Sequence, residues 1–244
     1  MTPGTEPLAA IVMAGGRGTR LRSKTPKFLV DLNGRPMVEW VLEAVRGVDP
    51  ERLVVVAPPG AGHTLSDLEV AIQEEPLGTA DAVASARTIL GDFAGDILLL
   101  PADTPLVRTM TLAGLVRRHR LYRSAVTVLS FRWPGRLPYG RIVRGRDGRL
   151  ASIVEEGDAT PDEKRITELN SSIYVFASAW LWKGIATLDT ANAKGELQLT
   201  SSIRQIVAAG AAAAVCEAGD PVEAIGVNTP EELEFAREAL RSRI

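Results

Sequence analysis

Short apolar runs alternate with helical segments through the first half of the chain, and this alternation limits the possible folds more than any other feature. The run Leu8–Ala14 is unbroken, as in a strand buried on both faces. Apolar side chains at helical spacing follow over residues 37–45, with Pro36 suited to the first turn. Further strands are expected at residues 52–58, 68–75, 96–103 and 124–132, and further helices at 79–90 and 109–122. This order predicts an α/β fold, a Rossmann-like, mostly parallel mixed sheet flanked by helices.

Three details of the helices can also be predicted. Thr79 is expected to cap the helix at 79–90, because a threonine hydroxyl can accept a free backbone N–H at that position. His119 stands in a run of arginines and is expected on a solvated helix face. Thr229 and Pro230 are expected to begin the last helix, with acidic residues in its first turn.

The second half of the chain changes character. Residues 139–156 are expected to form a hairpin that turns at 145–149. The remaining expected elements are strands at 168–178 and 212–218 and helices at 180–188, 199–209 and 229–244. No linker or low-complexity tract separates the halves, so we expect one domain over residues 1–244. Its expected parts are a first half at 8–131, an inserted lobe at 132–200 and a C-terminal strand and helix at 201–244.

Composition and charge bear on partners and location. The 244 residues carry a net charge of −2, so no overall field attracts nucleic acid or an anionic membrane. The N-terminal residues lack a basic leader, and no apolar run approaches the roughly 20 residues that a membrane span needs. The sequence has one cysteine, Cys216, which fits a reducing compartment. We expect a cytoplasmic protein with neither nucleic acid nor a membrane as partner, while its oligomeric state is not indicated.

A glycine-rich loop after the first strand gathers positive charge in this slightly acidic chain. Its cations are Arg17, Arg20, Arg22, Lys24 and Lys27. The loop lacks the third glycine of the dinucleotide fingerprint and the Gly-Lys-Ser/Thr of a Walker loop. Glycines can present backbone N–H groups to an anion, and Arg and Lys add full charges. The loop therefore predicts binding of a triphosphate.

A carboxylate is expected at the same edge of the sheet. Open α/β sheets bind ligands beyond the carboxyl ends of their strands. The glycine loop follows the strand at 8–14, and Asp103 ends the strand at 96–103. Two separate strands should therefore deliver a basic loop and an acid to one place.

The stretch MAGGRGTRLRSKTPKFL resembles the signature of the sugar-phosphate nucleotidyltransferases: a glycine-rich loop, Thr-Arg, and then Pro-Lys. The segments QEEPLGTADAV, LLLPADTPLV, PYGRIVRGRDGRLASIVEEGDAT and NAKGELQLT are similar, in order, to those of the bacterial N-acetylglucosamine-1-phosphate uridyltransferases. The resemblance covers about residues 8–240. It implies the nucleotide-diphospho-sugar transferase fold, with the inserted lobe binding the sugar. It also implies an Mg²⁺-dependent enzyme that joins UTP and a sugar 1-phosphate, expected to be N-acetylglucosamine 1-phosphate, into UDP-sugar and pyrophosphate.

The resemblance implies roles for individual residues. Those expected to hold the phosphates in catalysis are Arg20 and Lys27, and those expected to bind Mg²⁺ through oxygen are Asp103 and Asn228. Those expected to bind the nucleotide are Met13, Ala14, Gly15, Gly16, Gly18, Thr19, Gln73, Gly78 and Thr79. Those expected to bind the sugar are Gly140, Glu155 and Asn170.

Each polar residue also has an ordinary structural reading. From the residues alone, Asp103 could cap a helix and Glu155 could be solvated surface. Asn170 and Asn228 could be turn residues, and Asn228 could instead cap the last helix. These alternatives stay open at the level of sequence.

The chain departs from the family pattern near the expected sugar site. Pro101 and Ala102 stand where Tyr-Gly usually precedes the metal-binding Asp, and Ser201 stands where an acid is usual. These changes leave the sugar open. Bifunctional members of the family continue into a C-terminal β-helix acetyltransferase domain, and we expect that activity to be absent from this chain, which ends at Ile244.

Two rival functions remain at this level. One is a related nucleotidyltransferase that uses CTP, dTTP or GTP, or another phosphorylated acceptor. The other is a non-catalytic nucleotide-sensing module. The presence of both expected phosphate ligands and both expected metal ligands favours an enzyme.

Overall fold

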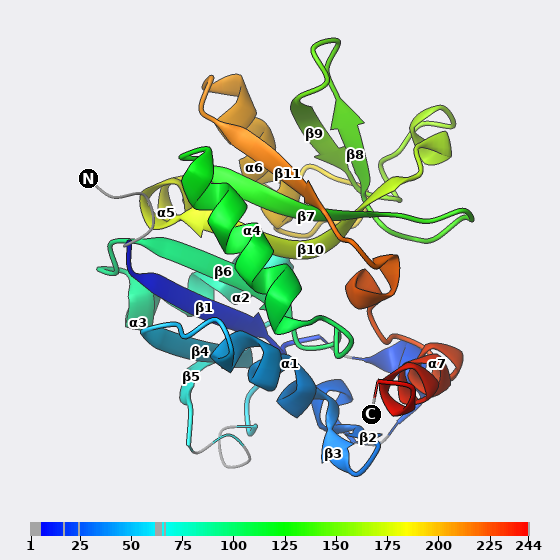
Figure 1. Cartoon of the computed structure of the whole chain (residues 1–244). Coiled ribbons are helices and arrows are strands. Elements are labelled where there is room, and N and C mark those ends of the chain that lie inside the picture. The colour runs from blue at the N-terminus through cyan, green and yellow to red at the C-terminus, as the bar shows by residue number, and fades with distance from the viewer. Residues whose placement is uncertain (1–5, 17, 24, 62–64, 66, 244) are drawn as a thin grey trace.

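The computed structural model describes residues 6–243 except residues 17, 24, 62–64 and 66 (Figure 1). Its strands are β1 (Leu8–Met13), β2 (Asp31–Leu32), β3 (Arg35–Pro36), β4 (Arg52–Ala57), β5 (Glu69–Ile72), β6 (Asp96–Pro101), β7 (Val126–Arg132), β8 (Arg141–Arg144), β9 (Leu150–Val154), β10 (Glu168–Ala177) and β11 (Ala213–Glu217). Its α-helices are α1 (Met37–Arg46), α2 (Thr79–Ser85), α3 (Arg87–Leu90), α4 (Thr109–Leu121), α5 (Ser178–Ile185), α6 (Leu199–Ala208) and α7 (Pro230–Arg241). Short 3-10 helices lie at Thr19–Leu21, Lys27–Leu29, Glu163–Arg165 and Pro221–Ala224.

The main sheet confirms the predicted α/β class. Its strands follow the order β11-β7-β10-β6-β1-β4-β5. β1 pairs in parallel with β4 and β6, and β4 pairs in parallel with β5. β10 runs antiparallel between β6 and β7, which makes the sheet mixed. This strand comes from the segment expected as an inserted lobe, so that segment contributes to the sheet itself.

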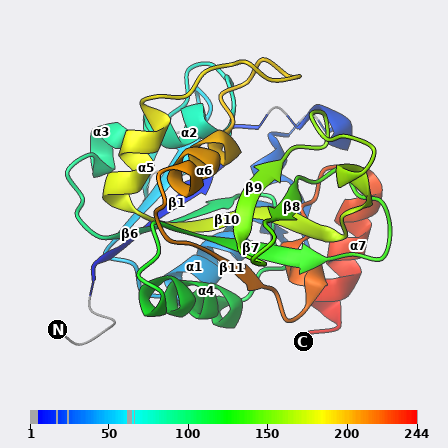
Figure 2. The same cartoon turned by 90° about the horizontal axis from the view of Figure 1, so that it is seen from above.

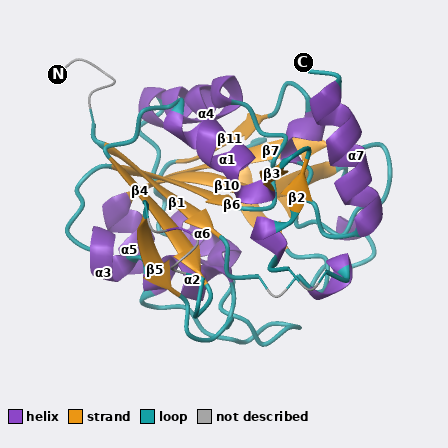
Figure 3. Ribbon diagram, turned by 90° about the horizontal axis from the view of Figure 1, so that it is seen from below, coloured by secondary structure: helices purple, strands orange, loops and turns teal. Residues whose placement is uncertain are grey.

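Helices cover both faces of the sheet, which explains the unbroken apolar run of β1 (Figures 2 and 3). Leu8, Ala10 and Val12 join a buried cluster with apolar side chains of α1 and α4. Ala9 and Ile11 point the other way and join a second cluster with α2, α5 and α6. Successive side chains of a strand alternate between faces, so residues 8–12 of β1 are all buried, and only Met13, at the cleft end, is partly exposed.

The predicted hairpin is confirmed as β8 and β9, which pair antiparallel. It joins the main sheet where Arg141 of β8 pairs with Leu169 of β10. The predicted start of α7 is confirmed too. The Thr229 hydroxyl accepts the N–H of Glu232, and the Glu232 carboxylate accepts the N–H of Thr229.

Two predicted helix starts were wrong by one residue. Pro36 is the N-cap of α1, not a member of its first turn. Gly78 is the N-cap of α2, and Thr79 is the first helical residue. The Thr79 hydroxyl instead accepts the N–H of Leu199 at 3.1 Å, because α6 begins beside it. The expected helix at 79–90 is also broken into α2 and α3.

The prediction that His119 is solvated was wrong. His119 is only 2% exposed, because α4 turns this side toward the sheet. Its Nδ1 lies 3.0 Å from Thr127 Oγ1, and its Nε2 lies 3.3 Å from Asp96 Oδ1. Arg120 Nε donates to Asp96 at 2.9 Å. Burial alone would raise the pKa of Asp96, but the hydrogen bonds from His119 and Arg120 hold it below the ordinary value.

A second buried carboxylate, Glu168, begins β10. Arg144 donates to both of its oxygens, at 2.6 and 2.7 Å, and Ser130 Oγ donates at 2.9 Å. Burial again pushes the pKa of this carboxyl up, but the bonds from Arg144 and Ser130 outweigh it and hold the pKa below the ordinary value. Both carboxylates are therefore stabilised in the charged form by the fold.

We expect acid to unfold the protein through these two carboxylates. A carboxyl whose pKa is lower in the folded state stabilises fully above its unfolded pKa, and that stability is lost as pH falls through the folded pKa. Chemical denaturation should therefore show stability falling below about pH 4.5, near the ordinary values of 3.8 and 4.5. Glu168→Gln should lower the free energy of unfolding at pH 7 and make its decrease below about pH 4.5 less steep. Exposed Glu238→Gln is the control, and an unchanged decrease in Glu168→Gln would contradict the assignment.

Candidate functional site

A cleft of about 830 Å³ opens beyond the carboxyl ends of β1 and β6. It extends from the glycine loop to the hairpin strands, and its lining includes these predicted site residues: Met13, Ala14, Gly15, Gly16, Gly18, Arg20, Lys27, Gln73, Gly78, Thr79, Asp103, Gly140, Glu155, Asn170 and Asn228. Thr19 begins a short 3-10 helix in the same loop, and its side chain lies outside the described part of the structure. The residues expected to bind phosphate, base, metal and sugar thus share one cavity.

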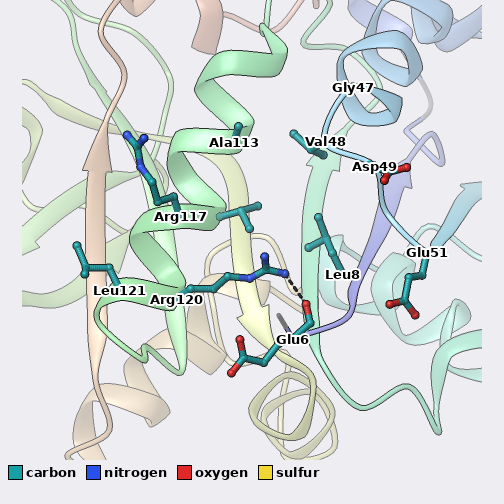
Figure 4. Close-up of a pocket in the computed structure, with 11 residues that line it drawn as sticks. Glu6, Leu8, Gly47, Val48, Asp49, Glu51, Ala113, Arg117, Arg120 and Leu121 are labelled. Atoms are coloured by element: carbon teal, nitrogen blue, oxygen red, sulfur yellow. Dashed lines mark hydrogen bonds between the residues drawn. The ribbon is translucent and has the colours of Figure 1, made fainter. Parts of the chain in front are cut away.

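A second cavity of similar volume lies at the opposite end of β1, between α4 and the turn after α1 (Figure 4). Apolar side chains of Leu8, Val48 and Val116 line it, together with acids such as Glu51 and the cation Arg117. No predicted site residue borders this cavity. The residues predicted from the sequence therefore gather at the cleft beyond the carboxyl ends and not at this second cavity.

Two positively charged side chains and the side-chain oxygens of two further residues meet at one end of the cleft. Lys27 Nζ forms an ion pair with Asp103 and donates to Asn228 Oδ1 at 2.8 Å. Arg20 Nη2 donates to the same Asn228 oxygen at 3.1 Å. The Lys27 side chain is 11% exposed and that of Asp103 is 24% exposed, so this pair is only partly shielded from water. A cation already occupies the point where the oxygens of Asp103 and Asn228 converge.

Asn228 does not cap the last helix. Thr229 takes that role, and the Asn228 backbone N–H donates to Glu232 Oε2 at 2.6 Å. The Asn228 side chain is thereby free to turn into the cleft. Its Nδ2 donates to the Gly226 carbonyl at 3.2 Å, which leaves Oδ1 for the cations. The capping reading left open by the sequence is thus excluded by the structure.

Gln73 and the backbone around Gly78 form the opposite wall. Gln73 is 4% exposed, and its Nε2 donates to Asp81 at 2.7 Å and to the Gly78 carbonyl at 3.3 Å. The Gln73 Oε1 atom lies against Gly15, where any side chain would collide with it. Sequence reasoning missed Asp81, which fixes the direction of this amide. Its position in the first turn of α2, beside Gly78 and Thr79, was the available signal.

Gly78 is required by both its conformation and its neighbour. Its φ is +133°, and a Cβ at this position would lie 2.5 Å from the Leu197 carbonyl oxygen. The backbones meet here because Leu197 N–H donates to the Leu77 carbonyl at 2.7 Å and Ala80 N–H donates to the Leu197 carbonyl at 2.9 Å. The loop before α6 is thus bound directly to the start of α2.

Gly78→Ala should destabilise the protein by about 1–3 kcal/mol, the usual cost of a strained backbone, with the collision adding to it. Denaturant unfolding measures this change. Gly114→Ala is the matched control, because a Cβ built at that helical position meets nothing within 4 Å beyond its chain neighbours and the backbone of its own helix. Alanine at Gly114 should be neutral or stabilising. Equal stability of the two variants would show that the contact at Leu197 is not tight.

The predicted sugar residues lie together at the other end of the cleft. A Cβ at Gly140 would meet Glu155 Oε2 at 3.4 Å and Asn170 Cβ at 3.5 Å. Thr200 Oγ1 donates to Glu155 Oε1 at 3.0 Å, and Asn170 Nδ2 donates to the Tyr174 hydroxyl at 2.7 Å. Burial raises the pKa of Glu155 despite the Thr200 hydrogen bond. Glu155 is therefore not plain solvated surface.

The backbone conformation around Asn170 explains how a strand residue reaches the cleft. The pairing of β10 with β7 shifts between Asn170 and Tyr174, and Ser172 has a φ of +63°. The Asn170 N–H donates to the Gly140 carbonyl at 2.8 Å, which ties the strand to the loop before β8. A local irregularity in the strand thus places Asn170 beside the hairpin.

The structure adds cleft residues that the sequence did not indicate. Tyr139, Lys194, Glu196 and Glu232 line the cleft beside the predicted set. Of the two departures from the family pattern, Pro101 lines the cleft, whereas Ser201 does not appear in the described lining. Ser201 follows Thr200 on α6, and Thr200 donates to Glu155, which does line the cleft.

The chain matches the family model of the MobA-like NTP transferase domain over residues 10–205. It belongs to this family. It is also similar to three proteins named bifunctional protein GlmU. The identity is 41% with that of Pelotomaculum thermopropionicum over 241 residues (97% of this chain, 53% of the relative). The identity with the protein of Geobacter metallireducens is 41% over 243 residues (97% of this chain, 51% of the relative). The identity with the protein of Nocardia farcinica is 41% over 250 residues (97% of this chain, 50% of the relative).

The chain spans about half the length of the curated relatives it matches. The resemblance predicted from the sequence is confirmed at the level of the family. In the part of the chain that the structure describes, every helix is too short or too polar to cross a membrane. Among the same described residues, no three His, Cys, Asp or Glu side chains cluster to hold a metal by themselves.

Proposed function

We propose that this domain joins UTP and a sugar 1-phosphate into a UDP-sugar and releases pyrophosphate. N-acetylglucosamine 1-phosphate is the proposed sugar. One observation carries the proposal: Arg20, Lys27, Asp103 and Asn228 meet in a cleft that continues to Glu155 and Asn170. A triphosphate and a sugar can therefore lie end to end in a single cavity. Similarity to proteins named GlmU supports the choice of sugar and nucleotide. As for location, we propose the cytoplasm, in line with the single cysteine.

The reaction is an in-line attack by a sugar-phosphate oxygen on the α-phosphorus of UTP. A phosphate monoester has a second pKa near about 6, so at neutral pH it is already largely the nucleophilic dianion. No side chain needs to remove a proton. The barrier lies in bringing two anions together and in stabilising charge on the leaving pyrophosphate. Arg20 and Lys27 supply positive charge both for bringing the two anions together and for stabilising the leaving pyrophosphate.

Lys27 has to change partners to do this. Its ammonium group is held by Asp103 and Asn228, which use two of its three N–H donors, so all three can turn to phosphate only once those oxygens release it. The four-carbon side chain allows such a movement without moving the loop. We propose that the same two oxygens then hold Mg²⁺.

The donor set fits Mg²⁺. Carboxylate and amide oxygens suit this hard cation, which keeps several waters and takes the rest of its ligands from phosphates. The oxygens of Asp103 and Asn228 already converge on a cation, the Lys27 ammonium. When bound, Mg²⁺ would neutralise phosphate charge beside Arg20. Two protein ligands suffice for such a site, consistent with the lack of a larger acidic cluster among the described residues.

The orientation of Gln73 favours uracil over cytosine. Its two amide hydrogens are used by Asp81 and the Gly78 carbonyl, which leaves Oε1, beside Gly15 of the cleft lining, as the acceptor. Uracil presents an N–H donor at ring position 3, whereas cytosine presents an acceptor there. An acceptor at Gln73 therefore complements UTP and opposes CTP.

A pyrophosphate-release assay tests the proposal, with UTP, CTP, dTTP and GTP each combined with a panel of sugar 1-phosphates. UTP with N-acetylglucosamine 1-phosphate should give the highest kcat/KM. A different best nucleotide or acceptor would make the chain a related nucleotidyltransferase. Tight nucleotide binding with no turnover in the whole panel would make it a sensing module.

A further inference from the structure

The structure assigns Tyr139 as a positioning residue. It connects the loop before the β8–β9 hairpin to the segment that places the side-chain oxygens of Asp103 and Asn228. The Tyr139 hydroxyl accepts the backbone N–H of Gly226 at 2.9 Å. Tyr139 precedes Gly140 at the start of the hairpin, and Gly226 lies two residues before Asn228. This inference rests on the proposed function, because it concerns how the proposed cation site is held.

The Gly226 peptide is fixed on both sides. Its N–H goes to Tyr139, and its carbonyl accepts from Asn228 Nδ2 at 3.2 Å. Because the Nδ2 end of the amide is engaged there, the Oδ1 end faces Lys27 and Arg20. The direction of the Asn228 oxygen therefore depends on where the Gly226 peptide lies.

Asp103 is tied to the same short segment. The Val227 N–H donates to the Asp103 carbonyl at 2.7 Å. A Cβ at Gly226 would lie 3.3 Å from Asp103 Oδ1 and 3.4 Å from Asn228 Nδ2, so this glycine is packed between the two side chains. A shift of the Gly226 peptide would therefore move both proposed ligands relative to each other.

The Tyr139 ring is itself held in place. It packs edge-on against Phe131 of β7, with ring centroids 5.2 Å apart and an interplanar angle of 84°. Burial raises the pKa of the Tyr139 hydroxyl to about 12, and the hydroxyl therefore stays neutral at physiological pH. A rigid ring thus presents its hydroxyl to Gly226, while the backbone of the same loop leads into the proposed sugar site.

Tyr139→Phe removes the hydroxyl and keeps the ring. Groups that orient metal ligands typically change metal affinity or activity by about 10–100-fold when they are removed. We expect the dissociation constant for Mn²⁺, measured by electron paramagnetic resonance on the nucleotide-free protein, to rise within that range. The Mg²⁺ concentration for half-maximal turnover should rise in parallel, while the KM for the sugar 1-phosphate changes little. Tyr122→Phe, at the exposed tyrosine that follows the last residue of α4 and lies under Arg118, is the matched control and should match wild type.

The outcomes separate this inference from the proposed function. An inactive wild-type protein in the nucleotide panel would overturn the function. An active wild type with Tyr139→Phe equal to it in Mn²⁺ affinity would overturn the positioning role alone, as would a wild type that binds no Mn²⁺. Should Tyr139→Phe fail to fold, Gly226→Ala perturbs the same peptide from the other side and should also weaken Mn²⁺ binding; unchanged affinity there would overturn the role.

Discussion

Lys27→Ala should lower kcat by roughly a hundredfold or more. Removing one group that stabilises developing charge typically costs about 3–4 kcal/mol in the transition state. Of Arg20 and Lys27, Lys27 is the more buried, with its side chain 11% exposed, so its charge is poorly replaced by water. Steady-state kinetics with UTP and the sugar 1-phosphate identified in the panel measures the effect.

The same variant should change metal binding in the opposite direction. Without the ammonium group, the oxygens of Asp103 and Asn228 no longer have to exchange one cation for another. Mn²⁺ should therefore bind more tightly to Lys27→Ala than to wild type, although turnover falls. Lys183→Ala is the control, because Lys183 is exposed and lies over the Trp180 ring, outside the cleft lining. Near-normal turnover in Lys27→Ala would refute its assigned role.

Asp103→Ala should abolish Mg²⁺-dependent turnover, with a loss of about a thousandfold or more. A bound metal ion commonly contributes several kcal/mol of charge stabilisation, and each 1.4 kcal/mol is about tenfold in rate. Asp103 supplies the only carboxylate of the proposed pair, so Asn228 alone would hold the cation weakly. Initial rates across a range of Mg²⁺ concentrations measure the loss, and full wild-type activity in excess EDTA would contradict the metal role.

Binding of UTP separates this defect from unfolding. In Asp103→Ala, Lys27 loses its ion-pair partner and is available to the phosphates. The affinity for UTP, measured by calorimetry without metal, should therefore be at least as high in Asp103→Ala as in wild type. The exposed Asp92→Asn variant is the control for both measurements. Weaker metal-free binding of UTP would show that Asp103 has a structural task beyond the cation site.

Local sequence patterns were enough to predict those elements whose character depends on neighbouring residues in the chain. The apolar run of β1 identified a strand with two covered faces, and the Thr229-Pro230 start identified α7. The prediction for His119 was wrong because neighbouring arginines gave no sign that α4 turns this one side chain toward Asp96. Thr79 was misplaced because its hydroxyl is taken by Leu199, a residue 120 positions away.

The same division applies to the candidate site. The residues themselves indicated that a polyphosphate-binding glycine loop and the acid Asp103 meet at one edge of the sheet, since strand ends of a parallel sheet converge. The cation and its second ligand, Asn228, were implied by the resemblance to the sugar-phosphate nucleotidyltransferases. Only the tertiary structure decided that Lys27 rests on Asp103 and Asn228, that Asp81 orients Gln73, and that Tyr139 holds Gly226. The physical reason is that hydrogen-bond direction depends on side chains brought together from distant segments, and no local pattern records which partner a side chain will meet.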